Sequence, residues 1–133
     1  MSVFVDTSAF LAVLDADGQF HQQARVIWER LLSGAADLLC TNHVLLETVA
    51  LAQRRLGLEA VRTLEEDVLP LIRVIWLAES HHRAAMAALL TAGRRDLSLV
   101  DCASFLVMRA SGVKTAFAFD DDFRRQGFDL PAG

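Results

Sequence analysis

Acidic residues at four separate places in the chain could together bind a divalent cation. Asp6 follows the apolar run Val3–Val5, and Glu47 lies within the apolar segment VLLETVAL. Asp101 lies in SLVDCAS, and Asp120–Asp122 directly follow TAFAF. Unpaired carboxylates are costly in apolar surroundings, and two like charges ~4 Å apart repel by roughly 4 kcal/mol at an effective dielectric constant of about 20. If these acids meet in the fold, they need protons, arginines or a cation, and a divalent ion is the simplest solution.

The chemistry expected of such a site follows from its ligand atoms. Carboxylate oxygens favour Mg²⁺ or Mn²⁺, and they make Zn²⁺ a poor candidate. An ion of this kind activates water and stabilises charge on a transferring phosphoryl group. Arg94 and Arg95 precede Asp96, while Arg124 and Arg125 follow the acidic run. These arginines could hold a nucleic-acid backbone, although solvated loop arginines fit the pattern equally well.

Each acid also has a purely structural interpretation. Asp6 is well placed to cap a helix, and Glu47 could be a solvated position on an otherwise buried helix. Asp101 completes the pattern S-x-x-D with Ser98, which resembles a capping box. Acids in the run Asp120–Asp122 would suit the positive end of a helix dipole. The metal-site hypothesis therefore depends on the fold bringing these positions together.

The elements that would position these acids alternate along the chain. Short apolar runs predict strands at Ser2–Val5, Asp37–Cys40, Leu71–Trp76 and Thr115–Phe119, with a short edge strand near Phe128–Leu130. Helical spacing and caps predict helices beginning at Ser8 and covering His21–Ser33, Asn42–Leu56, Leu58–Val68 before Pro70, Glu79–Ala92 and Ser98–Ala110. Such alternation indicates an α/β fold with a parallel sheet between helices. Strand C-termini and helix N-termini then share one edge, where ligands bind.

Composition limits the class of protein. The 133 residues predict a single domain, 1–133, with enough apolar sequence (53%) to bury a core without disulfides. Charges interrupt every apolar stretch well before the roughly 20 residues of a membrane span, and no signal peptide is expected.

Cys40 and Cys102 are predicted to be buried free thiols of a cytoplasmic protein, in preference to a disulfide. A net charge of −4 argues against a general nucleic-acid coat protein. Trp28 and Trp76 are predicted to lie in the core.

Taken together, the motifs resemble a known family. The segment VDTS that contains Asp6, the mid-chain Glu47, SLVDCAS around Asp101 and the late FDDDF around Asp120 are similar to a PIN domain of the small VapC-type toxins. The resemblance covers nearly the whole chain. It implies a three-layer α/β/α sandwich with a mostly parallel sheet, and a Mg²⁺- or Mn²⁺-dependent ribonuclease. It also implies an RNA substrate, a cognate antitoxin and a homodimer, while the charged residues between the apolar stretches argue against a membrane partner.

The resemblance also assigns site residues. It implies that Asp6, Glu47, Asp101 and Asp120 are catalytic and bind the metal, with Asp122 as a candidate fifth ligand. It places a hydroxyl, that of Thr7, beside the first acid. Thr7, Arg94, Arg95 and Arg124 are the candidate substrate-binding residues. One departure concerns Ala118, because the family often has Ser or Thr two residues before the fourth acid, so Asp120 and Asp122 could exchange roles.

The residues fit several other functions less well. An aspartyl phosphatase would need D-x-D after the first strand, where Ser8 replaces the second Asp. A phosphoreceiver domain would need paired acids there and a lysine after a late strand, and Lys114 precedes that strand. His81 and His82 are adjacent and point about 100° apart on a helix, which favours surface positions over a metal site. A catalytically silent interaction module of the same fold stays open as the alternative.

Overall fold

The four strands of the sheet are parallel and lie in the order β3–β2–β1–β4. They are β1 (Ser2–Val5), β2 (Asp37–Thr41), β3 (Arg73–Ile75) and β4 (Thr115–Phe117). This arrangement comes from a computed structural model, which describes residues 1–131. The predicted parallel sheet is confirmed.

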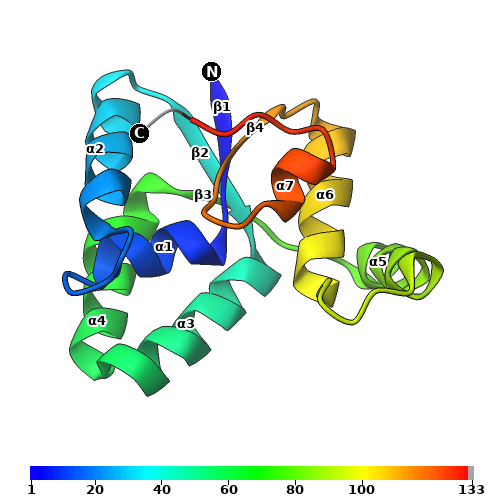
Figure 1. Ribbon diagram of the computed structural model, residues 1–133, viewed down its shortest axis with the longest axis horizontal. Helices are drawn as coiled ribbons and strands as arrows, with labels where there is room; N and C mark the ends of the chain where they lie inside the picture. Colours follow the sequence, from blue (N-terminus) through cyan, green and yellow to red (C-terminus); the bar gives the residue numbers. More distant parts are fainter. Residues whose placement is uncertain (132–133) are drawn as a thin grey trace.

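Helices cover both faces of this sheet. They are α1 (Thr7–Leu14), α2 (His21–Ser33), α3 (Asn42–Leu56), α4 (Leu58–Thr63), α5 (Glu79–Ala92), α6 (Leu99–Ser111) and α7 (Asp122–Arg125). Figure 1 shows α1, α2 and α4 on one side of the sheet and α6 and α7 on the other, with α5 outside α6. The α/β/α sandwich expected from the sequence is therefore present.

Strand β1 is the centre of the core. It lies between β2 and β4, and Val3, Phe4 and Val5 have no exposed surface. Burial on both faces explains why this strand is continuously apolar instead of alternating. Because β1 is fixed by neighbours on all sides, Asp6 at its C-terminal end is also held in place, and its backbone N–H donates to the Phe117 carbonyl at 3.0 Å.

Polar caps begin the helices at the C-terminal edge of the sheet. The Asp6 carboxylate accepts from the Ser8 N–H at the start of α1, and the Thr41 hydroxyl accepts from the Val44 N–H at the start of α3. Ser98 caps α6 and forms a capping box with Asp101. The capping interpretations of Asp6 and Asp101 are thus correct, and the same geometry brings both carboxylates to the edge where ligands bind in such sheets.

The predicted third strand is present at the edge of the sheet beyond β2, but it is shorter than expected. Strand β3 covers only Arg73–Ile75, because the helical backbone continues past α4 as a π-helical turn (Leu64–Val68) and a 3-10 turn (Leu69–Leu71). Pro70 lies at the start of that last turn, where its missing N–H is not needed. Trp76, predicted to be in the core, is 71% exposed because it follows the end of an edge strand. Trp28 packs against the core as predicted.

Strand β4 and the C-terminal strand are also shorter than predicted. The Phe119 N–H donates to the Ser8 hydroxyl instead of continuing the ladder, so β4 ends at Phe117. The predicted strand at Phe128–Leu130 is one bridge between Asp129 and Thr115. Pro131 would be the next donor in this parallel pairing and has no N–H, which explains the single bridge.

The two cysteines behave as expected. Cys40 and Cys102 are buried free thiols, and burial raises the pKa of Cys40 to about 12. Across residues 1–131, no helix combines the length and the apolar character that a membrane crossing needs.

Candidate metal centre and active site

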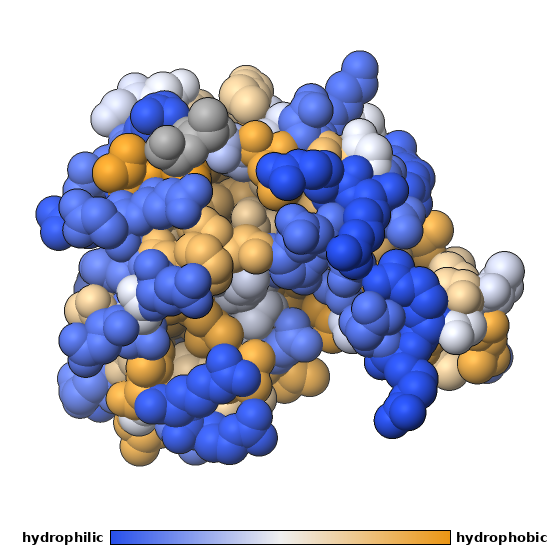
Figure 2. Space-filling view, in the orientation of Figure 1, coloured by the Kyte–Doolittle hydropathy of each residue, from blue (hydrophilic) through white to orange (hydrophobic). Residues whose placement is uncertain are grey.

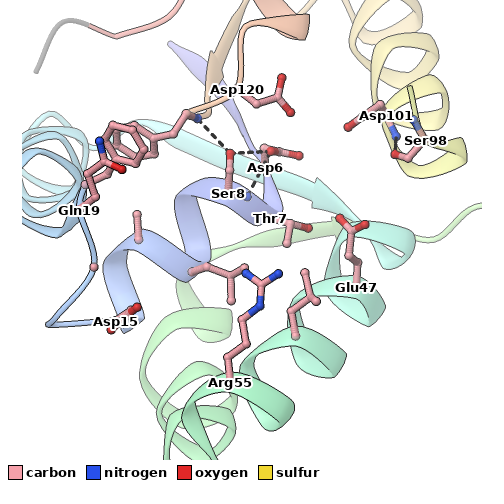
Figure 3. Close-up of a pocket in the computed structure, with 16 residues that line it drawn as sticks. Asp6, Thr7, Ser8, Asp15, Gln19, Glu47, Arg55, Ser98, Asp101 and Asp120 are labelled. Carbon is pink, nitrogen blue, oxygen red and sulfur yellow. Dashed lines mark hydrogen bonds between the residues drawn. The ribbon is translucent and has the colours of Figure 1, made fainter. Parts of the chain in front are cut away.

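Four of the predicted acids line one pocket of about 500 Å³ at the C-terminal edge of the sheet. Asp6 comes from the end of β1, Glu47 from α3, Asp101 from α6 and Asp120 from the segment after β4. Figure 3 shows all four side chains pointing toward a common space from these separate elements. The structure thus brings together residues that are up to 114 positions apart, as the sequence predicts for this sheet edge.

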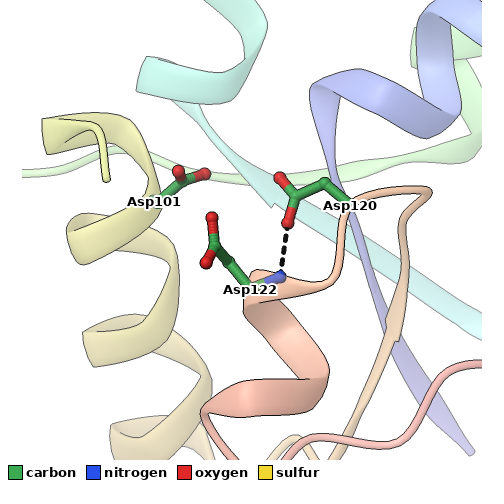
Figure 4. Close-up of side chains that lie close together, drawn as sticks. All are labelled: Asp101, Asp120 and Asp122. Atoms are coloured by element: carbon green, nitrogen blue, oxygen red, sulfur yellow. Dashed lines mark hydrogen bonds between the residues drawn. The ribbon is translucent and has the colours of Figure 1, made fainter. Parts of the chain in front are cut away.

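Three carboxylates form a tighter group within this site. Asp101, Asp120 and Asp122 can each offer one oxygen atom such that the three atoms lie within 4.8 Å of one another. Figure 4 shows their side chains converging from α6 and from the segment at the start of α7. The Asp122 N–H donates to Asp120 Oδ1 at 2.7 Å, which fixes the turn that presents both acids. Asp120 and Asp122 therefore reach the same cluster, as their exchangeable roles in the sequence suggest.

Asp6 is the most deeply buried acid of the pocket. It is 3% exposed, and burial raises the pKa of its carboxyl to about 7, with the nearby charges of Asp101 and Asp120 adding to the effect. The Ser8 hydroxyl opposes the shift by donating to Asp6 Oδ2 at 2.7 Å. Asp6 is not one of the three acids of that tight group. Even so, the negative charges of two of them, Asp101 and Asp120, raise the pKa of its carboxyl.

Asp101 and Asp120 are perturbed in the same direction. Burial raises the pKa of Asp101 to about 6, and repulsion from Asp120 and Glu47 contributes. The pKa of Asp120 is also raised, first by burial and then by the charges of Asp122 and Asp121. These raised pKa values come first from burial and then from mutual repulsion, so the pocket disfavours the charged forms of these carboxyls. A divalent cation would stabilise those charged forms.

Glu47 lies in the second turn of α3, half-buried, with its carboxylate facing the pocket (Figure 3). Leu51 and Arg55 follow it at intervals of four residues and line the same pocket. The spacing places the three residues on one face of the helix. Arg55 is absent from the predicted site, although its spacing from Glu47 could have revealed it.

The arginines of the predicted substrate site have different surroundings. Arg94 Nη2 donates to Asp96 Oδ2 and to Asp122 Oδ1, both at 3.0 Å. Arg125 approaches Asp122 at 3.4 Å, and Arg124 pairs with Asp121 at 3.7 Å on the surface. Asp122 is therefore the acid whose charge the protein already compensates, while no ion pair with Asp6, Asp101 or Asp120 is formed within residues 1–131.

Arg95 is exposed in the loop between α5 and α6, beside Arg94 in sequence. Neither Arg94, Arg95 nor Arg124 is among the residues that line the pocket. Arg94 and Arg95 precede α6, which carries Asp101, and Arg124 lies on α7, which begins at Asp122. Of the three, Arg94 contacts an acid of the cluster, Asp122.

Two residues with hydroxyl groups, Thr7 and Ser8, follow Asp6 in the sequence. The predicted site includes Thr7 but not Ser8. The Thr7 hydroxyl is buried between α1 and α3, where it donates to the Val44 carbonyl at 3.3 Å and accepts from the Thr48 hydroxyl at 3.2 Å. The Ser8 hydroxyl instead contacts Asp6 and accepts from the Phe119 N–H at 2.9 Å. Ser8 therefore supplies a hydroxyl next to the backbone of Ala118, the position where the expected Ser or Thr is missing.

The histidines are not part of this site. His81 and His82 are exposed on α5, and His81 Nδ1 accepts from the Ala78 N–H at 2.9 Å. The prediction that this pair lies on the surface is confirmed. Within residues 1–131, the group of three Asp side chains described above is the one with metal-ligand spacing among His, Cys, Asp and Glu.

The residues fit a hard divalent cation. They offer several carboxylate oxygens within 4.8 Å of one another, in a pocket where burial and mutual repulsion disfavour the unneutralised charges. Oxygen donors without nearby His or Cys ligands are typical of Mg²⁺ and Mn²⁺ sites.

Comparison with known proteins agrees with this architecture. The model of the PIN domain family matches residues 3–129. The chain is 35% identical over 127 residues to proteins described as 23S rRNA-specific endonuclease VapC20 from two Mycobacterium tuberculosis strains, covering 95% of both chains. It also superposes on the crystal structure of M. tuberculosis VapC20, described as a sarcin–ricin loop cleaving toxin, with a TM-score of 0.85 and 33% identity, covering 98% of this chain and 99% of that one.

More distant structures share the fold. Rickettsia felis VapBC2, bound to a DNA fragment from its promoter, gives a TM-score of 0.72 at 13% identity, covering 98% of both chains. Neisseria gonorrhoeae FitAcB gives 0.69 at 15% identity, covering 98% of this chain and 96% of that one. The full-length family match and the similarity to VapC20 show that this chain belongs to the PIN domain family and is of the VapC type.

Proposed function

We propose that this protein is a divalent-metal-dependent endoribonuclease and the toxin of a toxin–antitoxin pair. The observation that carries the proposal is the convergence of Asp6, Glu47, Asp101 and Asp120 on one pocket in a VapC-type PIN domain. The complete set of acids also argues against the silent interaction module, for which the loss of at least one acid would be expected.

Asp101, Asp120 and Asp122 would hold the metal ion, and Asp6 would complete the negative field from the end of β1. When bound, Mg²⁺ or Mn²⁺ supplies Lewis-acid stabilisation of the charge that develops on a scissile phosphate. Asp122 already has Arg94 and Arg125 as neighbours, so these arginines would compete with the metal ion for its carboxylate.

The remaining residues would orient the reactants. Glu47 faces the pocket from α3, where its carboxylate can orient the attacking water and accept its proton (Figure 3). Arg95 and Arg124 are exposed on the segments that lead to Asp101 and follow Asp122, and they can contact the RNA backbone, together with Arg94 when it leaves Asp122. Thr7 would act by fixing α1 against α3, because its hydroxyl is already bonded to groups of α3.

Direct attack of water on phosphorus leaves a 5′-phosphate and a 3′-hydroxyl. The 2′-hydroxyl of the RNA is not a nucleophile in this scheme, which separates it from metal-free ribonucleases that form cyclic phosphates. Analysis of the product ends therefore tests the mechanism independently of the rate.

The similarity to VapC20 suggests a substrate. We take the sarcin–ricin loop of 23S rRNA as the first candidate, because VapC20 is described as cleaving it. A cognate antitoxin, a homodimer and a cytoplasmic location belong to the same proposal.

The test uses purified protein with a hairpin RNA that carries the sarcin–ricin sequence. Wild-type protein should cleave it in Mg²⁺ or Mn²⁺, and EDTA should stop cleavage. Asp101→Asn should reduce the rate at least about 100-fold, since a metal ion contributes several kcal/mol to such reactions. Asp67→Asn is the matched control, because Asp67 is an exposed acid of the π-helical turn. Cleavage that survives EDTA and Asp101→Asn would disprove the mechanism, and inactivity of the wild type on a broad RNA pool would favour the interaction module.

A further inference from the structure

Two phenylalanine rings form one wall of the acidic pocket, and the ribonuclease chemistry above does not use them. Phe20 and Phe119 both line the pocket, and their rings stack with centroids 4.9 Å apart and planes 15° apart. Phe119 immediately precedes Asp120, and Phe20 lies at the N-terminal end of α2. The aromatic pair therefore adjoins the acids directly.

The pair is anchored from beneath. Phe117, which is 1% exposed in β4, contacts the Phe119 ring edge-on with centroids 5.8 Å apart. The Phe119 N–H is bonded to the Ser8 hydroxyl, which itself bonds Asp6. The position of Phe119 is thus fixed relative to the acids by the same contacts that position the acids, and Phe20 is held through its stacking on Phe119.

The outer ring stays open to solvent. Phe20 is 40% exposed, although its partner Phe119 is half-buried. Figure 2 shows one face of the molecule, with apolar surface in its middle between hydrophilic surface on both sides. A rigid and partly exposed aromatic surface beside a phosphodiester-cleaving site has the properties of a stacking platform for a nucleobase.

Polar groups surround this platform. Figure 3 shows Asp15 and Gln19 across the pocket from Glu47 and Asp101, and the Arg55 guanidinium rising from α3 toward the space between them. Gln19 and Asp15 can exchange hydrogen bonds with a base edge. Arg55 can neutralise a phosphate next to the scissile one. The pocket therefore contains groups suited to each part of a nucleotide.

We propose that the pocket binds a nucleotide next to the scissile phosphate of RNA, with its base stacked on the Phe20–Phe119 pair and its phosphate near Arg55. This assignment rests on the proposed ribonuclease function and extends it to substrate recognition. Stacking on an aromatic ring is possible for every base, so Phe20 strengthens binding without selecting a base. Selection between bases would come from hydrogen bonds to Gln19 and Asp15.

The test measures binding separately from cleavage. Fluorescence anisotropy in Ca²⁺ compares a labelled oligoadenylate with an abasic ribose–phosphate chain of the same length, and gels verify that the RNA remains intact. Wild-type protein should bind the oligoadenylate at least about 5-fold more tightly than the abasic chain, the lower end of the measured range for stacking on one aromatic side chain. Phe20→Ala and Phe20→Leu should lose most of this difference, and Phe20→Trp should retain it.

Leu90→Ala serves as the matched control, because Leu90 is a 73% exposed apolar residue on α5, outside the pocket. It should bind both probes as the wild type does. Thermal unfolding of every variant checks the fold, and the Trp variant distinguishes loss of an aromatic face from general damage.

The outcomes separate the two proposals. If wild-type protein binds both probes equally, or if Phe20→Ala leaves the difference unchanged, the stacking site is wrong even where the hairpin is cleaved. If base-dependent binding is lost in Phe20→Ala but the wild type cleaves no RNA, the stacking site stands and the ribonuclease proposal fails. Absence of both binding and cleavage overturns both.

Discussion

At the scale of single residues, Asp6 is the acid whose burial most disfavours the charged carboxylate that the proposed metal site needs. Its carboxyl is almost completely buried beside Asp101 and Asp120, and Ser8 is its close hydrogen-bond donor. An apolar residue or an Asn at this position would be easier to bury. The cost of keeping an acid here is consistent with a site that is completed by a cation.

The burial of this carboxyl predicts that the metal-free protein loses stability as the pH rises. The pKa of Asp6 is about 7 in the fold and about 3.8 in the unfolded chain. Between these values the folded protein holds a proton that the unfolded chain releases, so the free energy of unfolding falls from about pH 4 to about pH 7 and then levels off. Each pKa unit corresponds to about 1.4 kcal/mol, giving a loss of up to about 4 kcal/mol from this group.

Thermal unfolding in EDTA at pH 5 and pH 8 measures the effect. Asp6→Asn should flatten the profile and raise the midpoint at pH 8. Asp101, whose pKa is about 6, acts in the same direction and leaves a smaller residual slope. A metal-free wild type that is equally stable or more stable at pH 8 would contradict this assignment.

Arg94 offers a second prediction at the residue scale. Its guanidinium neutralises Asp122 and would compete with a cation for that carboxylate. Arg94→Ala should tighten Mn²⁺ binding in calorimetry and raise KM for RNA. Arg83→Ala is the control, because Arg83 forms an exposed ion pair with Glu79 on α5. Weaker Mn²⁺ binding in Arg94→Ala would show that Arg94 supports the metal site instead of competing with the ion.

At the scale of elements, the junction of β1 and α1 organises the site. Ser8 in the first turn of α1 bonds both Asp6 and the backbone after β4, and it thereby joins the segments that carry Asp6 and Asp120. The hydrogen bond that ends β4 at Phe117 is also the one that orients these acids. The early end of β4 at Phe117 is therefore part of the geometry that positions Asp6 and Asp120.

Ser8→Ala should therefore weaken both the fold and the site. Loss of the hydroxyl removes two hydrogen bonds, which should lower the free energy of unfolding by about 1–3 kcal/mol. It should also raise the pKa of Asp6 further, because the hydroxyl lowers it, and so move the acidic limb of the pH–rate profile to higher pH. Ser33→Ala, at the exposed end of α2, is the control. An unchanged pH–rate profile in Ser8→Ala would argue against this link.

At the scale of the whole molecule, the core and the site depend on different interactions. The core consists of apolar side chains around β1, and Asp6 is the member of the acid set that is buried beside them. Removal of the metal should therefore leave the fold intact but less stable. Only the edge of the sheet, where like charges meet, should respond.

The expected result is a higher thermal midpoint in Mg²⁺ or Mn²⁺ at neutral pH. A ligand at 100 times its Kd stabilises the fold by about 2.7 kcal/mol. Circular dichroism in EDTA should retain the helical signal of the metal-loaded protein. Asp101→Asn should reduce the shift and stabilise the metal-free form by removing repulsion. Calorimetry that detects no binding of either ion to the wild type would contradict the metal hypothesis.

The sequence by itself determined the central strand, the caps and the acids. Val3–Val5 are apolar because both faces of β1 are covered, and Asp6, Thr41 and Ser98 begin helices through local hydrogen bonds. These features depend on neighbouring residues, so local sequence reveals them. Parallel topology then places Glu47 and Asp101 at the same edge as Asp6.

Only the tertiary structure decided what depends on contacts between distant segments. It ended β4 through the bond from Phe119 to Ser8, exposed Trp76 beyond an edge strand, and turned Arg94 toward Asp122. It also stacked Phe20 on Phe119 beside the acids. Hydrophobicity and spacing carry no information about such pairings, because each partner is ordinary in its own stretch and acquires its role when the fold places the two together.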